Sequence, residues 1–209
     1  MSNLPELIDL VEMELKDTGN AQWSTEELTA HIRRALRAYN RVQPRRAQGV
    51  ISATKGEREY SLASLSGLME VLEVWHPWDD DDPCYPPQRP AWSVLYDGTL
   101  RVEVDDAPIG DGTDDIRVFY AIPHTMNGLD GEETSTLDDQ GEQVIVLGAS
   151  AYAASQLAQS LIGTVTVTSQ TPDQYNKWAA ARMNDFELAL EQLRRRANIS
   201  QDARTHPQE

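Results

Sequence analysis

The 209-residue chain has few of the residues that usually mark a chemical site: one cysteine, Cys84, and four scattered histidines. A single cysteine excludes an internal disulfide framework and suits a reducing compartment. The sequence has neither a basic leader followed by an apolar run nor a stretch of roughly 18 apolar residues. It also lacks a glycine-rich loop ending in Gly-Lys-Ser/Thr, the usual phosphate-binding signature. We therefore expect a soluble, unprocessed protein without a membrane partner.

Catalytic and metal-binding patterns are equally scarce. The histidines stand far apart in the sequence, so no nucleophile and base can be paired. Ligand-type groups are dense only in WHPWDDDDPCYPPQRP, residues 75–90. Four consecutive aspartates in a proline-rich loop lack the fixed alternation of a calcium-binding loop. We predict no catalytic residue, no metal site and no cofactor, and we do not expect an enzyme.

Basic residues are rare in the middle of the chain. Residues 70–143 contain 19 Asp and Glu but only Arg89, Arg101 and Arg117 as basic residues. The flanking segments together hold 15 acidic and 15 basic residues, so the net charge of −16 falls within this stretch. The sequence thus predicts a neutral scaffold carrying one acidic module, whose field repels DNA.

Two helices are predicted at the N-terminus. The first spans about residues 4–16, and Gly19 is expected to end that segment. The second begins with a capping box formed by Ser24 and Glu27. Trp23 precedes the cap, where its ring can fold over Leu28 as a hydrophobic staple. The short link between the helices favours an antiparallel hairpin.

After Pro44 the pattern changes to short alternating segments that predict an antiparallel β module. Asp97-Gly98 is expected to form a tight type I′ turn in the clearest hairpin. Another turn is expected at Lys55-Gly56, between two neighbouring strands. The expected strands lie within 49–62, 69–75, 91–104 and 116–122.

A polar loop at 127–143 leads into two C-terminal helices. The third helix carries small residues around Gly148, which would let a neighbouring helix backbone approach closely. The fourth helix is expected to start at Thr171-Pro172 and to end in Arg194, Arg195 and Arg196. The polar residues that follow are expected to be flexible in isolation.

Together these elements predict an α+β fold: a four-helix body, made of the N-terminal helical hairpin and two C-terminal helices, with an inserted small antiparallel β module. The predicted boundaries are 1–46 and 141–197 for the body, 47–126 for the acidic β module, 127–140 for the polar loop and 198–209 for a flexible tail.

Several motifs occur in a familiar order. They are Asp17-Thr18-Gly19, the segment Trp23 to Leu28, the strand from Gly56 to Leu62, the hairpin from Trp92 to Leu100, and the small-residue helix near 148–158. In this order they resemble the head-to-tail adaptor (connector, head-completion) proteins of tailed bacteriophages. The resemblance covers most of residues 4–193, and it depends on the order of the motifs because none is specific alone.

The resemblance implies a structural virion protein that forms a ring, usually of twelve copies, between the portal vertex and the tail. Implied partners are other copies of the chain, the portal protein and a tail or nozzle protein. Double-stranded DNA would pass through the lumen without sequence-specific binding. The implied location is the neck of the virion, after assembly in the host cytoplasm.

Two interpretations stay open for the basic face of the second helix. It is either a solvated surface or one side of a heterologous seam between subunits, where arginine forks pair with carboxylates of the adjacent copy. The hypothetical seam residues are Arg34, Arg37, Arg41, Glu6, Asp9 and Glu12.

Two further contacts are hypotheses. Arg194, Arg195 and Arg196 either complement the dipole at a helix C-terminus or dock on an acidic surface of the portal. The loop at 75–90 is either packed on its own β module or contacts a tail protein through exposed aromatic and acidic residues. The residues proposed for that contact are Trp78, Asp79, Asp80 and Tyr85.

The acidic module also allows two interpretations beyond solubility. Negative charge on a channel wall would keep DNA centred, because many phosphate contacts around a ring would hold the DNA back. Alternatively, the chain is an acidic DNA-mimicking inhibitor of a nucleic-acid-binding protein. Such an inhibitor would be a monomer or dimer that competes with DNA.

Overall fold

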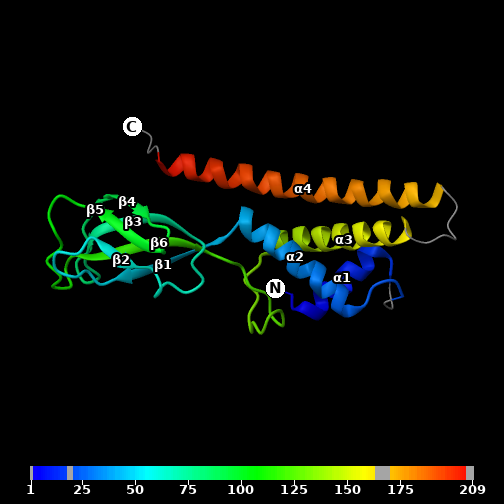
Figure 1. Cartoon of the computed structure of the whole chain (residues 1–209), viewed down its shortest axis with the longest axis horizontal. Helices are drawn as coiled ribbons and strands as arrows, with labels where there is room; N and C mark the ends of the chain where they lie inside the picture. The colour runs from blue at the N-terminus through cyan, green and yellow to red at the C-terminus, as the bar shows by residue number, and fades with distance from the viewer. Residues whose placement is uncertain (1, 18–20, 163–169, 206–209) are drawn as a thin grey trace. The chain divides into compact units, whose positions relative to one another are not determined.

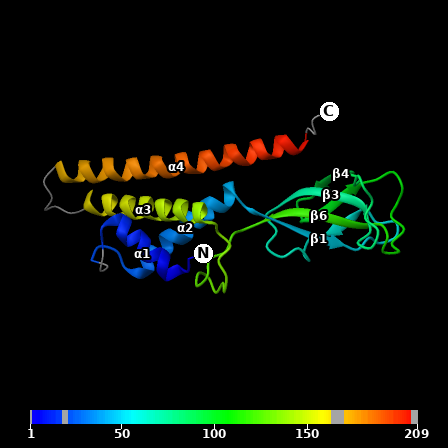
Figure 2. The same cartoon turned by 180° about the vertical axis from the view of Figure 1, so that it is seen from behind.

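The computed structural model describes residues 2–17, 21–162 and 170–205. Two compact units are present: a helical unit, Met1–Gln43 with His124–Glu209, and a β unit, Pro44–Pro123. Figure 1 and, from behind, Figure 2 show the helices of one unit and the strands of the other. Four helices and two small antiparallel sheets confirm the α+β class predicted from the sequence.

The first helix, α1 (Leu4–Leu15), begins with a capping box formed by Asn3 and Glu6. The Asn3 side chain accepts from the amide of Glu6, and the Glu6 carboxylate accepts from the Asn3 amide at 3.0 Å. The helix ends where Lys16 adopts a left-handed conformation, with φ 58°. The expected end at Gly19 lies outside the described residues.

The second helix, α2 (Thr25–Val42), starts as predicted. The Ser24 hydroxyl accepts from the Glu27 amide, and the Glu27 carboxylate accepts from the Ser24 amide. Trp23 and Leu28 are both buried in the same cluster of apolar side chains, as a hydrophobic staple requires.

A buried carboxylate shapes the connection between α1 and α2. The two carboxylate oxygens of Asp17 accept hydrogen bonds from the backbone amides of Ala21, Gln22 and Trp23, at 3.0–3.2 Å. Asp17 is itself buried. The first residue of the Asp-Thr-Gly motif thus ties down the chain that leads into α2.

The third helix, α3 (Asp139–Ile162), occupies the centre of the helical unit. It packs most extensively against α4, then against α2 and α1. The small-residue face predicted from the sequence is present, because a Cβ at Gly148 would lie 2.5 Å from the Phe186 ring of α4. Although Asp139–Leu161 is long and apolar enough to cross a membrane, half of the apolar window is buried in the unit, as in a core helix.

The loop before α3 is held in place by apolar and polar contacts. Its side chains Leu129 and Leu137 are buried in the apolar core of the helical unit. His124 and Asn40 exchange two hydrogen bonds, since the Asn40 amide group donates to the His124 carbonyl and accepts from its amide. Asp138 accepts from the Gly141 amide at 2.7 Å and caps α3. The helix therefore begins at Asp139, inside the segment expected to be loop.

The fourth helix, α4 (Gln170–Thr205), is longer than predicted at both ends. It already includes Gln170, so the start at Thr171-Pro172 is too late. It continues nine residues past Arg196, which corrects the prediction that the three arginines end the helix. The segment expected to be a flexible tail is helical as far as Thr205, and residues 206–209 lie outside the described residues.

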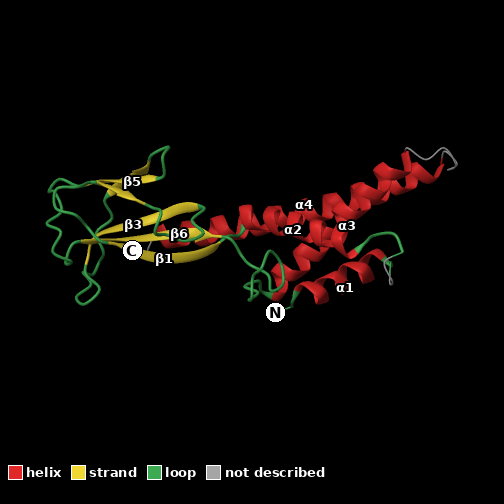
Figure 3. Ribbon diagram, turned by 60° about the horizontal axis from the view of Figure 1, so that its bottom comes forward, coloured by secondary structure: helices red, strands yellow, loops and turns green. Residues whose placement is uncertain are grey.

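The β unit consists of two three-stranded antiparallel sheets. One has the order β1-β6-β3 and the other β2-β5-β4, and Figure 3 shows them as separate layers. Their apolar sides meet in one cluster that includes Tyr60, Val74, Leu100 and Val118. The strands are β1 (Arg45–Ile51), β2 (Glu59–Ser61), β3 (Glu70–Trp78), β4 (Ala91–Val94), β5 (Thr99–Glu103) and β6 (Asp115–Ile122).

Three details of the β unit differ from the prediction. β1 and β2, expected to flank the Lys55-Gly56 turn as neighbours, belong to different sheets. The β4–β5 hairpin is not type I′, because Gly98 has a positive φ (80°) but Asp97 does not. The Leu95 carbonyl accepts from the Gly98 amide, so Gly98 follows an ordinary turn instead. β3 continues to Trp78 through Pro77, which an edge strand tolerates.

The charge is shared more evenly than the sequence suggested. The β unit holds 15 acidic and 7 basic residues, and the helical unit holds 19 and 11. Each unit therefore has a net charge of −8. The reason is that the acidic segment 124–143 belongs to the helical unit, while the β unit begins with the basic stretch 44–58.

Candidate interaction surfaces

The outer side of α2 forms a basic surface, called here the arginine face: Arg33, Arg34, Arg37 and Arg41 with Ala30, Ala38 and, from α3, Tyr152. These residues line a hollow of about 570 Å³. The Arg34 guanidinium lies over the Tyr152 ring, 4.0 Å from its centroid. Arg34, Arg37 and Arg41 are all exposed, so the structure brings the three predicted seam arginines together on one surface.

Arg33, which the sequence analysis did not single out, has a partner of its own. Its Nε donates to Asp130 at 2.9 Å, and a second nitrogen lies 2.7 Å from the same carboxylate. This hydrogen bond lowers the pKa of Asp130, and the charge of Arg37 contributes to the shift. The remaining three arginines of the face are therefore the ones available to a partner.

The three predicted acidic seam residues of α1 have different surroundings. Glu6 is exposed but closes the α1 capping box, and Asp9 is exposed. Glu12 is half-buried within the helical unit. The three carboxylates therefore differ in exposure, and their part in a subunit seam stays a prediction.

A second hollow, of about 700 Å³, lies between α1 and the beginning of α3. Its apolar side chains include Leu10 and Met13, which are 41% and 64% exposed. We call it the acidic groove; it is lined by Leu10, Met13, Glu14, Asp139, Glu142, Gln143, Val146 and Leu147. Two of its carboxylates have partners in the same chain: Glu142 accepts from the amide and hydroxyl of Ser2, and Glu14 pairs with Arg182.

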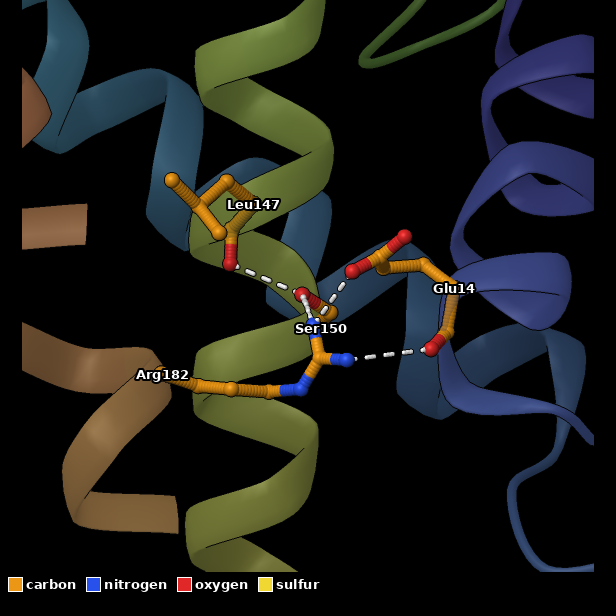
Figure 4. Close-up of polar contacts among 4 residues, drawn as sticks. All are labelled: Glu14, Leu147, Ser150 and Arg182. Atoms are coloured by element: carbon orange, nitrogen blue, oxygen red, sulfur yellow. Dashed lines mark hydrogen bonds and ion pairs between the residues drawn. The ribbon is translucent and has the colours of Figure 1, made fainter. Parts of the chain in front are cut away.

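Arg182 joins three helices through contacts that include Glu14, a residue of this groove (Figure 4). From α4 it reaches past α3 to α1, where it donates to a Glu14 carboxylate oxygen at 2.6 Å and to the Glu14 carbonyl at 3.3 Å. It also lies 3.3 Å from the Ser150 hydroxyl, which in turn donates to the Leu147 carbonyl. These contacts fix the wall of the groove, and only the folded chain reveals them, because residues 14 and 182 are far apart in sequence.

The predicted portal-binding arginines lie on an exposed side of α4. Arg194 and Arg195 pair with Glu191 on the preceding turn, at 3.7 and 3.1 Å. Arg196 donates to Gln140, near the start of α3, at 3.2 Å. Since α4 continues beyond them, these residues are too far from its C-terminus to complement the helix dipole there.

The loop predicted to contact a tail protein is only partly exposed. Trp78 is 8% exposed, because it belongs to β3 and lies under Arg117, whose guanidinium is 4.2 Å from the ring centroid. Its indole nitrogen donates to Asp80 at 2.6 Å. Asp79 is half-buried and accepts from the backbone of the same loop, whereas Tyr85 is 93% exposed. The expectation of an exposed Trp78 is therefore wrong, while Tyr85 is available to a partner.

The three histidines among the described residues take part in hydrogen bonds within the chain. His31 bonds to Gln156, His124 to the Thr136 carbonyl, and the buried His76 to the Asp115 carbonyl. Within residues 2–17, 21–162 and 170–205, no group of three or more His, Cys, Asp or Glu side chains is placed to hold a metal ion.

Partial structural matches to this chain occur in solved structures of gene transfer agent (GTA) particles. A chain in a structure of the virion of the native gene transfer agent (GTA) particle is 16% identical, with 71% of this chain and 76% of that chain covered and a TM-score of 0.31. A chain in the neck of the empty GTA particle, computed with C6 symmetry, is 14% identical, with coverages of 70% and 76% and a TM-score of 0.32. A chain in the neck of the native GTA particle, computed with C12 symmetry, is 14% identical, with coverages of 73% and 80% and a TM-score of 0.30.

No family model and no curated protein matches the chain. At the identities and TM-scores above, the superpositions by themselves establish neither a shared fold nor a shared function. The chain has a low structural similarity to chains of the GTA virion and neck, and the identities, coverages and TM-scores above describe its full extent.

Proposed function

We propose that this chain is a structural neck protein of a phage-like particle, in which copies form a ring adaptor between the portal vertex and the tail. The order of the sequence motifs carries this proposal. Capped N-terminal helices, an inserted hairpin-rich β segment and a small-residue helix follow one another as they do in phage head-to-tail adaptors. In the described residues these motifs fall on α1, α2, the β unit and α3.

The surfaces suit an assembly role. The helical unit exposes the arginine face and the acidic groove on different elements, as heterologous subunit contacts require. The acidic surplus of both units would keep DNA from adhering to a channel wall. The exposed Tyr85, with Asp80, would be available to a tail protein, and Arg194 and Arg195 to the portal.

The test of the proposal is the mass of the purified protein in light scattering, alone and mixed with portal rings. A ring of twelve copies would have a mass of about 280 kDa, from 23.4 kDa per copy. Growth into a closed ring, alone or on the portal, is the expected result. A chain that stays monomeric in both conditions would contradict the proposal.

Portal docking through α4 has its own test. Removing residues 194–209 is expected to prevent recruitment of the protein to capsids while leaving the chain folded. If capsids still acquire the shortened protein normally, the arginines have no docking role.

The net charge of −16 favours one alternative, an acidic inhibitor that imitates DNA. Such a protein would be a monomer or dimer and would compete with DNA for a basic protein. If the chain does not bind portal rings but competes with DNA for a basic protein, this alternative is favoured over the ring adaptor.

A further inference from the structure

We propose that the arginine face of one copy binds in the acidic groove of the next copy, so that these two surfaces form the head-to-tail seam. The inference rests on the proposed ring function and specifies its partner surfaces. It replaces the seam expected from the sequence, in which Glu6, Asp9 and Glu12 would have supplied the acidic side.

The groove has the chemistry of a protein-binding site. Its lining includes Leu10 and Met13, both exposed although they are large and apolar. The same lining carries the carboxylates of Glu14, Asp139 and Glu142. Asp139 makes no ion pair with any other residue that the structure describes. Exposed apolar side chains beside polar groups suit an interface, which has an apolar core and a polar rim.

The arginine face complements this groove in charge. Arg37 and Arg41 point a basic edge outward, while Ala30 and Ala38 leave a hollow between the arginines. Met13, which is 64% exposed, would insert its side chain into that hollow. Planar guanidinium groups are suited to bidentate pairing with a carboxylate such as that of Asp139, the groove carboxylate without an ion pair among the described residues.

The two surfaces also point in suitable directions. With about 100° between successive residues of a helix, the groove residues of α3 and Tyr152 lie about 150° apart around the helix axis. α3 thus separates the acidic groove from the arginine face. Two different surfaces on nearly opposite sides of one element are what a head-to-tail chain of copies needs, whereas a two-fold dimer uses one surface twice.

The seam can be tested with two variants, each defective on one surface. The groove variant is Met13→Lys with Asp139→Asn, and the face variant is Arg37→Glu with Arg41→Glu. All four side chains are exposed, so both variants are expected to keep the circular dichroism of the wild type. The matched controls are Leu188→Lys and Lys177→Glu, which change exposed α4 residues outside both surfaces.

Each variant alone is expected to lose ring assembly, while both controls assemble like the wild type. Mixed together, the two variants should form a one-to-one dimer of about 47 kDa, twice 23.4 kDa. The intact arginine face of one variant would fill the intact groove of the other, and growth would stop there. Assembly of either variant at wild-type level, or a folded mixture without dimers, would overturn the proposed seam.

Crosslinking tests the same contact independently of ring stability. In a Cys84→Ser background, chains with Met13→Cys and chains with Ala38→Cys are mixed and treated with a short bismaleimide. The crosslinked yield should exceed that of a Leu188→Cys and Ala38→Cys pair by about tenfold, because association raises the effective concentration. Equal yields would overturn the seam, and rings that form without this crosslink would leave the proposed function standing.

Discussion

Replacing Gly148 with alanine tests whether close helix contact holds the helical unit together. A Cβ at this position would lie 2.5 and 2.7 Å from two ring carbons of Phe186, and 3.0 Å from the Cβ of Ala35. Carbon atoms in good contact are about 3.5–4.0 Å apart. Phe186 is fully buried and its ring meets Tyr152 edge-on, so it has little room to move.

The expected magnitude follows from two opposing effects. Overpacking a core costs about 1–3 kcal/mol, and an overlap of more than 1 Å against a confined ring belongs near the upper value. Alanine gains about 1 kcal/mol over glycine from its helix propensity. The free energy of unfolding should therefore fall by about 2 kcal/mol, the difference between these effects.

Urea unfolding followed by circular dichroism measures this change. Ala180→Gly, at an exposed position of α4, provides the control, and it should lower the free energy of unfolding by about 1 kcal/mol through propensity alone. Combining Gly148→Ala with Phe186→Leu should cost less than the sum of the two single changes. An unchanged or more stable Gly148→Ala variant, or additivity within about 0.5 kcal/mol, would refute the reasoning.

Three more predictions concern buried and charged groups. Asp17→Asn should lower the free energy of unfolding by about 2 kcal/mol, because an amide cannot accept from all the backbone donors that the carboxylate satisfies. Burial, with the charge of Asp138, raises the pKa of Tyr39 to about 12. The unfolded state then loses this proton first, so stability should fall between about pH 10 and 12, and Tyr39→Phe should remove that part of the loss. Arg33 lowers the pKa of Asp130, so their pairing stabilises the fold above about pH 4 and this stabilisation is lost as the pH falls. Because both side chains are largely exposed, the loss in the free energy of unfolding should be less than about 1 kcal/mol.

Each of these has a measurement that can contradict it. For Asp17→Asn, urea unfolding would contradict the prediction if the variant had the same free energy of unfolding as an Asp9→Asn control, in which an exposed residue is changed. A Tyr39→Phe variant with the same alkaline stability profile as the wild type would contradict the assignment to Tyr39. For the Arg33–Asp130 pair, an Asp130→Asn variant should lose part of the acid sensitivity, and an identical pH profile would be evidence against it.

Local signals account for the parts of the fold that the sequence predicted well. The start of α2 was predictable because Ser24 and Glu27 satisfy each other within one turn. The close approach at Gly148 was predictable because small side chains recur along α3. The hairpin formed by β4 and β5 was also located correctly, although its turn type was not.

Features that depend on distant partners were missed. β1 and β2 are consecutive, but their pairing with β6 and β5 places them in different sheets, and no local pattern encodes that choice. Trp78 was taken for an exposed loop residue because it lies in the proline-rich, aspartate-rich segment 75–90, whereas it belongs to β3. The contact of Arg182 with Glu14, which shapes the acidic groove, spans 168 positions. Only the arginines of α2, which share one helix face, could be grouped from the sequence.

The net charge leads to a last prediction that separates the two proposed functions. Every copy carries −16, so copies repel one another over long distances, and only the local match of arginine face and acidic groove draws them together. The screening length falls from about 30 Å at 0.01 M salt to about 8 Å at 0.15 M. Raising salt across this range should therefore promote ring assembly, because salt screens the long-range repulsion more than the attraction at the short contacts.

The binding of an inhibitor to a basic protein would instead weaken steadily as salt rises, since opposite net charges drive that association. Light scattering over this salt range distinguishes the two, and assembly that declines from the lowest salt upward would contradict the seam's role in overcoming repulsion.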